Sequence, residues 1–223
     1  MREIKTEAII LKRTNYGESD RILTILTPLG KKSALAKAVR RERSKLAGAV
    51  EPFSLTELNL HEGKSELLIV TGAKPKKFYS NLLKDFSRLE VASEVLKRVM
   101  KVSELVDNAE HFEITKQCLE ALNNGADIET VLTWFYLNIA KSSGGEMNLH
   151  FDSDGEVLKA DKQYVWDYTE GAMRKDAAGK IGRNEIKMLR LMTAAKLNLV
   201  LKVSGTKEMM PELLYVAKTL NQL

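Results

Sequence analysis

The chain has 223 residues, with 35 Lys or Arg, 30 Asp or Glu and an apolar fraction of 44%. These values predict a globular protein with enough apolar residues for one large domain or two modest ones. No apolar run is long enough for a bilayer helix, and residues 1–5 mix acid and base where a signal peptide needs an apolar segment. The single cysteine, Cys118, excludes an intramolecular disulfide and a thiolate metal cage. We therefore expect a cytoplasmic protein.

Positive charge is concentrated near the N-terminus. Residues 1–80 hold 16 Lys or Arg against 9 Asp or Glu, a net charge of +7, whereas the remainder is net −2. Within residues 31–45 seven cations stand against Glu42 alone. Guanidinium and ammonium groups bind phosphate oxygens, so the stretch predicts a contact with a polyanion, although a solvated basic loop is the ordinary alternative. The cations are Lys31, Lys32, Lys37, Arg40, Arg41, Arg43 and Lys45.

The first 80 residues show the patterns of short strands. Residues 3–13 alternate and then become continuously apolar, and residues 20–27 are rich in β-branched and aliphatic types. A turn at Pro28 to Lys31 leads to a third strand, about 31–39, with Ala34, Ala36 and Ala38 on one face and Leu35, Lys37 and Val39 on the other. The small residues suit a tightly curled interior.

A fourth strand begins at Pro52, and its apolar residues change parity between Leu55 and Leu58, which predicts a β-bulge near Thr56 and Glu57. Residues 67–70 form the fifth strand. Five short strands with a basic loop between the third and the fourth fit a five-stranded OB barrel. An SH3-like barrel is the main competitor, and the sequence separates the two poorly.

Beyond residue 78 apolar residues recur at helical spacing, so residues 74–77 are the predicted linker. We expect an α+β fold with two domains, an OB-fold nucleic-acid-binding domain at 1–77 and a helical domain at 78–223. Asp127 is the predicted N-cap of a helix that is apolar on nearly every face and therefore lies in a core. Further predicted elements are a β-hairpin at 149–158 around Asp154-Gly155 and helices at 161–174, 184–200 and 209–220.

The sequence lacks the constellations of an enzyme. It contains no phosphate-binding glycine loop, no His-Glu-x-x-His and no Gly-x-Ser-x-Gly motif, and its three histidines are far apart. Asp152-x-Asp154-Gly155 lacks the further ligands of a calcium loop and is interpreted as a turn. We expect no catalytic residue and no metal site.

The barrel offers a better candidate site. Cations and one aromatic residue near the ends of the first three strands, together with the basic loop, can line one groove, because neighbouring strands of a small barrel bring these positions together. Such a groove suits single strands, since cations follow the phosphate backbone and rings stack on bases. The candidate DNA-binding residues are Lys12, Arg13, Tyr16, Arg21, Lys37, Arg40, Arg41, Arg43 and Lys45.

Several segments resemble the start of the bacterial recombination mediator RecO family, in order and spacing, across about seventy residues. They are Ala8-Ile9-Ile10-Leu11-Lys12-Arg13, Tyr16-Gly17-Glu18-Ser19-Asp20-Arg21-Ile22-Leu23, Leu26-Thr27-Pro28-Leu29-Gly30-Lys31, Ala34-Leu35-Ala36-Lys37, Arg40-Arg41, Ser44-Lys45-Leu46, Glu51-Pro52-Phe53 and Glu57-Leu58. The helical remainder is similar to that family in layout more than in residues.

The resemblance implies an OB barrel that binds single- and double-stranded DNA, followed by a helical domain. It also implies a non-catalytic role in DNA repair and recombination: annealing of complementary strands and loading of RecA onto DNA covered by single-strand binding protein, with RecR as partner. Many relatives carry a four-cysteine zinc module where this chain has residues 144–160, which contain no cysteine, so we predict a hairpin in its place and no zinc. Relatives also usually have a glycine where this chain has Ala38-Val39, just before the basic pair.

Two other classes of function fit less well. An RNA-binding OB protein matches the composition equally, and competition between matched DNA and RNA strands would separate it. A hydrolase with a hidden carboxylate site is disfavoured by the missing motifs.

Overall fold

The computed structural model describes residues 3–62, 67–106 and 108–220. The chain packs as two compact units, one ending at Asn123 and the other beginning at Asn124. Within the described residues, no helix combines the length and the apolarity needed to cross a membrane. The domain division expected at residues 77 and 78 stays a prediction.

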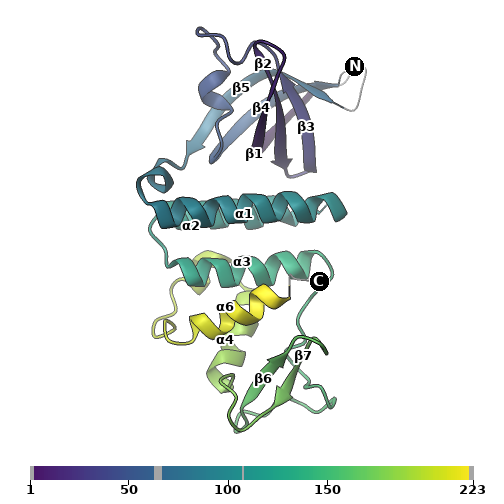
Figure 1. The fold of residues 1–223 in the computed structure, drawn as a ribbon, viewed down its shortest axis with the longest axis vertical. Coiled ribbons are helices and arrows are strands. Elements are labelled where there is room, and N and C mark those ends of the chain that lie inside the picture. The colour runs from purple at the N-terminus through teal and green to yellow at the C-terminus, as the bar shows by residue number, and fades with distance from the viewer. Residues whose placement is uncertain (1–2, 63–66, 107, 221–223) are drawn as a thin grey trace. The chain divides into compact units, whose positions relative to one another are not determined.

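The first unit contains a closed barrel of five strands (Figure 1). The strands are β1 (Glu3–Tyr16), β2 (Asp20–Thr27), β3 (Gly30–Ala36), β4 (Ser54–Glu62) and β5 (Leu68–Phe78). Their order around the ring is β1-β2-β3-β5-β4, with β3 and β5 parallel and the other pairs antiparallel. This ring is an OB-like barrel, as the sequence predicted.

Apolar side chains fill the barrel and also cover part of its outside. Ala8 and Ile10 of β1 point into the core, where small Ala34 and Ala36 allow the tight curl that was expected. Ile9 faces outward opposite both Leu26 and Leu55, and all three are buried. Helices α1 (Phe86–Leu105) and α2 (Glu110–Asn123) contact β1, β2 and β3 and bury this outer patch.

Ion pairs attach α2 to the barrel. Glu7 of β1 receives Lys76 of β5 at 2.9 Å and Lys116 of α2 at 3.6 Å. The hydrogen bond from Lys76 holds the pKa of the Glu7 carboxyl below its ordinary value. Lys77 of β5 also pairs with Glu120 of α2. These contacts join α2 to the barrel around the apolar patch.

The bulge predicted near Thr56 and Glu57 has a counterpart, because the pairing of β4 with β5 shifts register between Leu55 and Thr56, but the extra residue is not on β4. The pairing of β4 with β1 runs unbroken from Leu55 to His61, and Thr56, Leu58 and Leu60 keep facing inward. The parity changes at Leu55 because that residue packs on the outside of the barrel. The extra residue lies on β5, where Lys76 is skipped between Pro75 and Lys77 in the pairing with β4.

The predicted linker at 74–77 is also wrong, since these residues continue β5 to Phe78. Proline has no N–H for a strand ladder, but it is tolerated beside a bulge, and Pro75 lies next to the skipped Lys76. A 3₁₀ turn, Ser80–Lys84, then leads into α1.

The second unit is built on α3 (Ile128–Ser142). Asp127 caps this helix, as predicted, by accepting hydrogen bonds from Thr130 N at 2.9 Å and Thr130 Oγ1 at 2.7 Å. Helices α4 (Arg183–Ala194) and α6 (Met210–Thr219) contact α3 and cover its apolar faces. The helix predicted at 184–200 ends at Ala194, and α5 (Leu197–Val200) follows two extended residues.

The helix predicted at 161–174 is wrong. This segment forms two antiparallel strands, β6 (Tyr164–Asp167) and β7 (Ala172–Lys175), which Figure 1 shows beside the helices of the second unit. Tyr164 and Trp166 are buried at a period of two residues, and Gly171 has φ +62° in the connecting turn. The hairpin predicted at 149–158 is present in a short form: a tight turn with one antiparallel bridge, between Phe151 and Val157.

Candidate nucleic-acid interface

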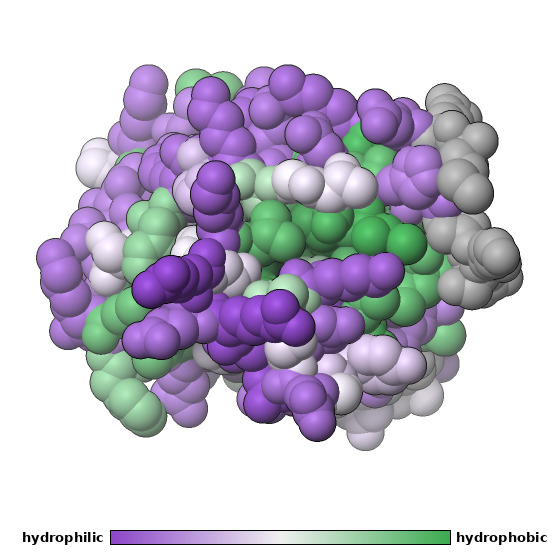
Figure 2. All heavy atoms as spheres, turned by 90° about the horizontal axis from the view of Figure 1, so that it is seen from above, coloured by the Kyte–Doolittle hydropathy of each residue, from purple (hydrophilic) through white to green (hydrophobic). Residues whose placement is uncertain are grey.

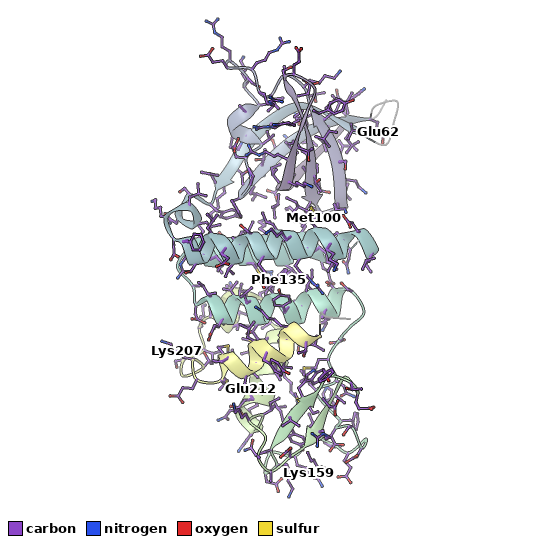
Figure 3. All side chains as sticks on the ribbon, in the orientation of Figure 1. Glu62, Met100, Phe135, Lys159, Lys207 and Glu212 are labelled. Carbon is purple, nitrogen blue, oxygen red and sulfur yellow. The ribbon has the colours of Figure 1, made fainter. Side chains whose placement is uncertain are left out.

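The basic loop, residues 37–45, is anchored to the barrel by one apolar residue within it and one beyond it. Val39 and Val50 are fully buried in the barrel core, while Arg41, Arg43 and Lys45 are exposed. Backbone hydrogen bonds close successive turns, from Arg41 N to Ala38 O at 3.2 Å and from Ser44 N to Arg41 O at 3.0 Å. In Figure 3 long side chains with nitrogen at their tips project from this end of the barrel. The loop therefore has defined turns and presents its cations to solvent.

Three hydrogen bonds fix the loop beside the turn that joins β1 to β2. Ala38 N donates to Asp20 Oδ1 at 2.7 Å, and Arg40 N donates to Ser19 O at 2.9 Å. The Arg40 guanidinium also donates to Gly17 O at 3.3 Å. The basic loop and the β1–β2 turn thus form one surface, and Arg40 helps to hold it together.

The third strand ends earlier than predicted because of Ala38. The strand stops at Ala36, and Ala38 has φ +53°, which turns the chain so that Val39 is buried and Ala38 is partly exposed. The sequence predicted the opposite, with Ala38 on the inner face of the strand and Val39 on the other face. Left-handed φ is the conformation that glycine adopts without steric cost, so Ala38 is strained here.

Replacing Ala38 by glycine is expected to raise the free energy of unfolding by about 0.5–1 kcal/mol. The left-handed conformation costs an L-residue about 1–2 kcal/mol, and the greater freedom of glycine in the unfolded chain offsets about half of that gain. Urea unfolding followed by circular dichroism measures the change. Ala36→Gly, at a buried strand position, is the control and is expected to destabilise the protein. A lower midpoint for Ala38→Gly would contradict the explanation.

Part of the predicted site lies on the outer face of β1, β2 and β3. Lys12 pairs with Thr24, and Thr14 pairs with Ile22, which pairs in turn with Leu35. Because paired residues share a face, Lys12 lies on the same face as the half-buried side chains of Ile22 and Leu35. The ring of Tyr16, on the same face, is 54% exposed. Among the described residues, the exposed cations of the predicted site without an ion pair are Lys12, Lys37, Arg40, Arg41, Arg43 and Lys45.

Arg13 and Arg21 are placed differently. Arg13 pairs with core residue Leu23 and Arg21 with core residue Ala36, so both side chains lie on the inward-facing side of the sheet at the end of the barrel. Arg13 forms an ion pair with Glu51, and Arg21 Nη1 lies 3.8 Å from the same carboxylate oxygen. These two arginines therefore belong to a neighbouring cluster organised by Glu51, which the sequence did not indicate as part of the site.

The run of charge in the sequence is not one patch in the structure. Lys31 lies at the start of β3 and pairs with Glu104 of α1 at 3.2 Å. The six-residue separation from Lys37 corresponds to about 20 Å along a strand. Lys31 thus serves the packing of α1, and the candidate interface begins at Lys37.

Figure 2 views the molecule from the top of Figure 1, the side on which the basic loop lies. Hydrophilic residues cover most of this face, and an apolar strip lies between them. A surface that mixes cations with apolar groups suits a polymer with a charged backbone and stacking bases.

The residues at 144–160 do not fit a zinc ion. The segment has no cysteine, and its buried carboxylate, Asp152, accepts the N–H groups of Asp154 at 3.0 Å and Glu156 at 2.9 Å. Its second oxygen lies 3.1 Å from the Lys175 ammonium, which takes the place a cation would need. In the described ranges no three His, Cys, Asp or Glu side chains gather as metal ligands. The absence of zinc stays a prediction.

The fold and the site define a class: OB-barrel proteins with a cationic face, to which many single-strand-binding modules belong. Comparison with known families gives the particular one. The model "Recombination protein O N terminal" matches residues 1–79, and "Recombination protein O C terminal" matches residues 75–220. The chain belongs to the recombination protein O family of DNA repair and recombination proteins, which are non-enzymatic mediators.

Curated relatives named "DNA repair protein RecO" match over much of the chain. The protein of Roseiflexus sp. (strain RS-1) is 36% identical over 182 residues, 80% of this chain and 63% of the relative. That of Dehalococcoides mccartyi (strain CBDB1) is 29% identical over 219 residues, 95% of this chain and 86% of the relative. That of Alkaliphilus metalliredigens (strain QYMF) is 36% identical over 144 residues, 63% of this chain and 58% of the relative. In the first and third the match spans less than two thirds of the relative.

Proposed function

We propose that this chain binds single- and double-stranded DNA through the basic loop and the outer face of β1 to β3. The observation that carries the proposal is a set of exposed cations without ion pairs, held by hydrogen bonds beside an exposed tyrosine. Phosphates neutralised by these cations release counterions, while Tyr16 stacks on a base. The proposed contacts are Lys12, Tyr16, Lys37, Arg40, Arg41, Arg43 and Lys45, with Arg13 and Arg21 beside them.

We further propose that the bound strands are annealed to their complements. In this role the chain assists the loading of RecA onto DNA coated by single-strand binding protein, together with RecR, in the cytoplasm. Family membership supports these partners, and the site supports only the binding of DNA.

The test is fluorescence anisotropy of a labelled single strand titrated with the protein at two salt concentrations, followed by addition of the complementary strand. Six cations on phosphates predict that log K falls with log salt with a slope of about −4. Matched RNA and double-stranded DNA are titrated alongside. Salt-sensitive binding with faster annealing supports the proposal. Strong preference for RNA, or binding without annealing, contradicts the mediator role, and absence of binding contradicts the whole proposal.

A further inference from the structure

The cluster of Arg13, Arg21 and Glu51 lies at the same end of the barrel as the basic loop, but its charge is internally compensated. Glu51 Oε1 pairs with Arg13 and lies 3.8 Å from Arg21 Nη1, while Arg21 Nε donates to Asn15 Oδ1 at 3.3 Å. The side chains of Arg13 and Arg21 are 24% and 23% exposed, and that of Glu51 is 37% exposed. Two guanidinium groups thus converge on one carboxylate at an accessible position.

We propose that Glu51 occupies, in the free protein, a phosphate site formed by Arg13 and Arg21, and that a backbone phosphate of single-stranded DNA displaces it on binding. This inference rests on the proposed function. Glu51 then acts as an internal competitor of the phosphate and lowers the affinity of the protein for DNA.

The chemistry of the two arginines favours phosphate over the resident carboxylate. A guanidinium group has five donors in a planar fork, which matches a phosphate as well as a carboxylate. Glu51 reaches Arg13 closely, but at 3.8 Å its oxygen is beyond hydrogen-bond distance of Arg21. A phosphate has more oxygen atoms in a tetrahedral arrangement and can accept from both arginines at once.

The backbone around Glu51 allows the side chain to leave without disturbing the barrel. Val50 is buried in the core, and Ser54 Oγ donates to Glu51 O at 2.5 Å, so the main chain stays in place. Ion pairs with a partly exposed carboxylate are weak and are screened by salt. Displacement of the side chain therefore removes only a modest interaction.

The competing explanation is that Glu51 only orients the two arginines. The two explanations predict effects of opposite sign when the carboxylate becomes an amide. A carboxylate that blocks a phosphate site lowers affinity, so its removal strengthens binding. A carboxylate that orders the arginines supports the site, so its removal weakens binding or leaves it unchanged.

The experiment compares Glu51→Gln with the wild type in anisotropy titrations of a single-stranded oligonucleotide over a range of salt. We expect affinity to rise about three- to tenfold at low salt, and the salt slope to become steeper by about 0.7, the value for one more neutralised phosphate. Glu208→Gln is the matched control, because it removes an exposed carboxylate that lies outside the proposed contact and has no ion pair in the described residues. An equal gain in both variants would mean that only net charge matters and would overturn the proposal.

Arg13→Gln, measured in both backgrounds, completes the design. If the carboxylate blocks the site, Arg13→Gln costs more affinity in the Glu51→Gln background than in the wild type. If Arg13→Gln costs the same affinity in both backgrounds, or if Glu51→Gln binds DNA more weakly than the wild type, the inference is overturned. The proposed function is tested separately, by whether the wild type binds DNA. Unfolding midpoints confirm that the variants fold. If Glu51→Gln does not fold, Glu51→Asp, whose shorter side chain withdraws from the arginines, replaces it with a smaller expected gain.

Discussion

Reversal of Arg41, Arg43 and Lys45 to glutamate in one variant is expected to lower the affinity for DNA by about a hundredfold or more at moderate salt. Each lost phosphate contact removes close to one unit from the salt slope, so the slope should fall by about two to three. The loss is expected for every DNA sequence alike, because phosphates carry no base information. These three residues are chosen because they are exposed and make no ion pair in the described residues, whereas Arg40 also holds the loop through Gly17 O.

The matched control reverses three exposed lysines of the second unit, Lys196, Lys202 and Lys207, which changes the net charge by the same amount. We expect this control to lower affinity by less than about threefold, since charges outside the contact act only through the screened field of the protein. Equal losses in the two variants would show that net charge, and not the basic loop, governs binding. Anisotropy titrations over a salt range measure both.

The strands of the barrel were predictable because alternation of apolar and polar residues is a local signal. The expected strand at 20–27 has the bounds of β2. The way the ring closes was not predictable, because β3 pairs in parallel with β5 although β4 lies between them in the sequence. The sequence alone therefore left the OB and SH3-like barrels open.

The largest error, the helix predicted at 161–174, arose from an ambiguous spacing. Tyr164 and Tyr168 fit a helical period, but Tyr164, Val165 and Trp166 are also strong strand formers. The packing of β6 against β7 decides between the two, and that pairing depends on the turn at Gly171. A short apolar run with a glycine five residues beyond it indicated a hairpin equally well.

The candidate site was predictable as far as its charges are exposed. The basic loop is contiguous in the sequence, so composition indicated it directly. The compensation of Arg13 and Arg21 by Glu51 joins residues far apart in the chain, and only the strand register brings them together. Likewise, nothing in the sequence near Lys31 indicates that its partner is Glu104 of α1. Sequence patterns show where cations are, and the fold determines which of them are free.

Replacement of Lys175 by methionine is expected to destabilise the second unit strongly. Lys175 lies 3.1 Å from Asp152 Oδ2 and 2.8 Å from Glu156 Oε2, and Asp152 is only 5% exposed. Without the ammonium group, a buried carboxylate oxygen loses its partner, so we expect the thermal midpoint to fall by about 10 °C at neutral pH. Trp134 and Trp166, the two tryptophans of the chain, both lie in this unit and report its unfolding by fluorescence. Asp152→Asn combined with Lys175→Met should recover part of the loss.

The pH dependence gives the same pair a second test. Burial raises the pKa of Asp152, but the hydrogen bond from Lys175 and the backbone N–H of Glu156 outweigh it and hold the pKa below its ordinary value. The bond from Lys175 also lowers the pKa of Glu156. A lowered folded pKa contributes stability above the unfolded pKa, near 4, and this contribution is lost as the pH falls through the folded pKa. In Lys175→Met only the burial and the N–H bonds remain, so acidification should destabilise the variant less than the wild type. Parallel melting curves from pH 7 to pH 3 that keep a constant separation would contradict the assignment.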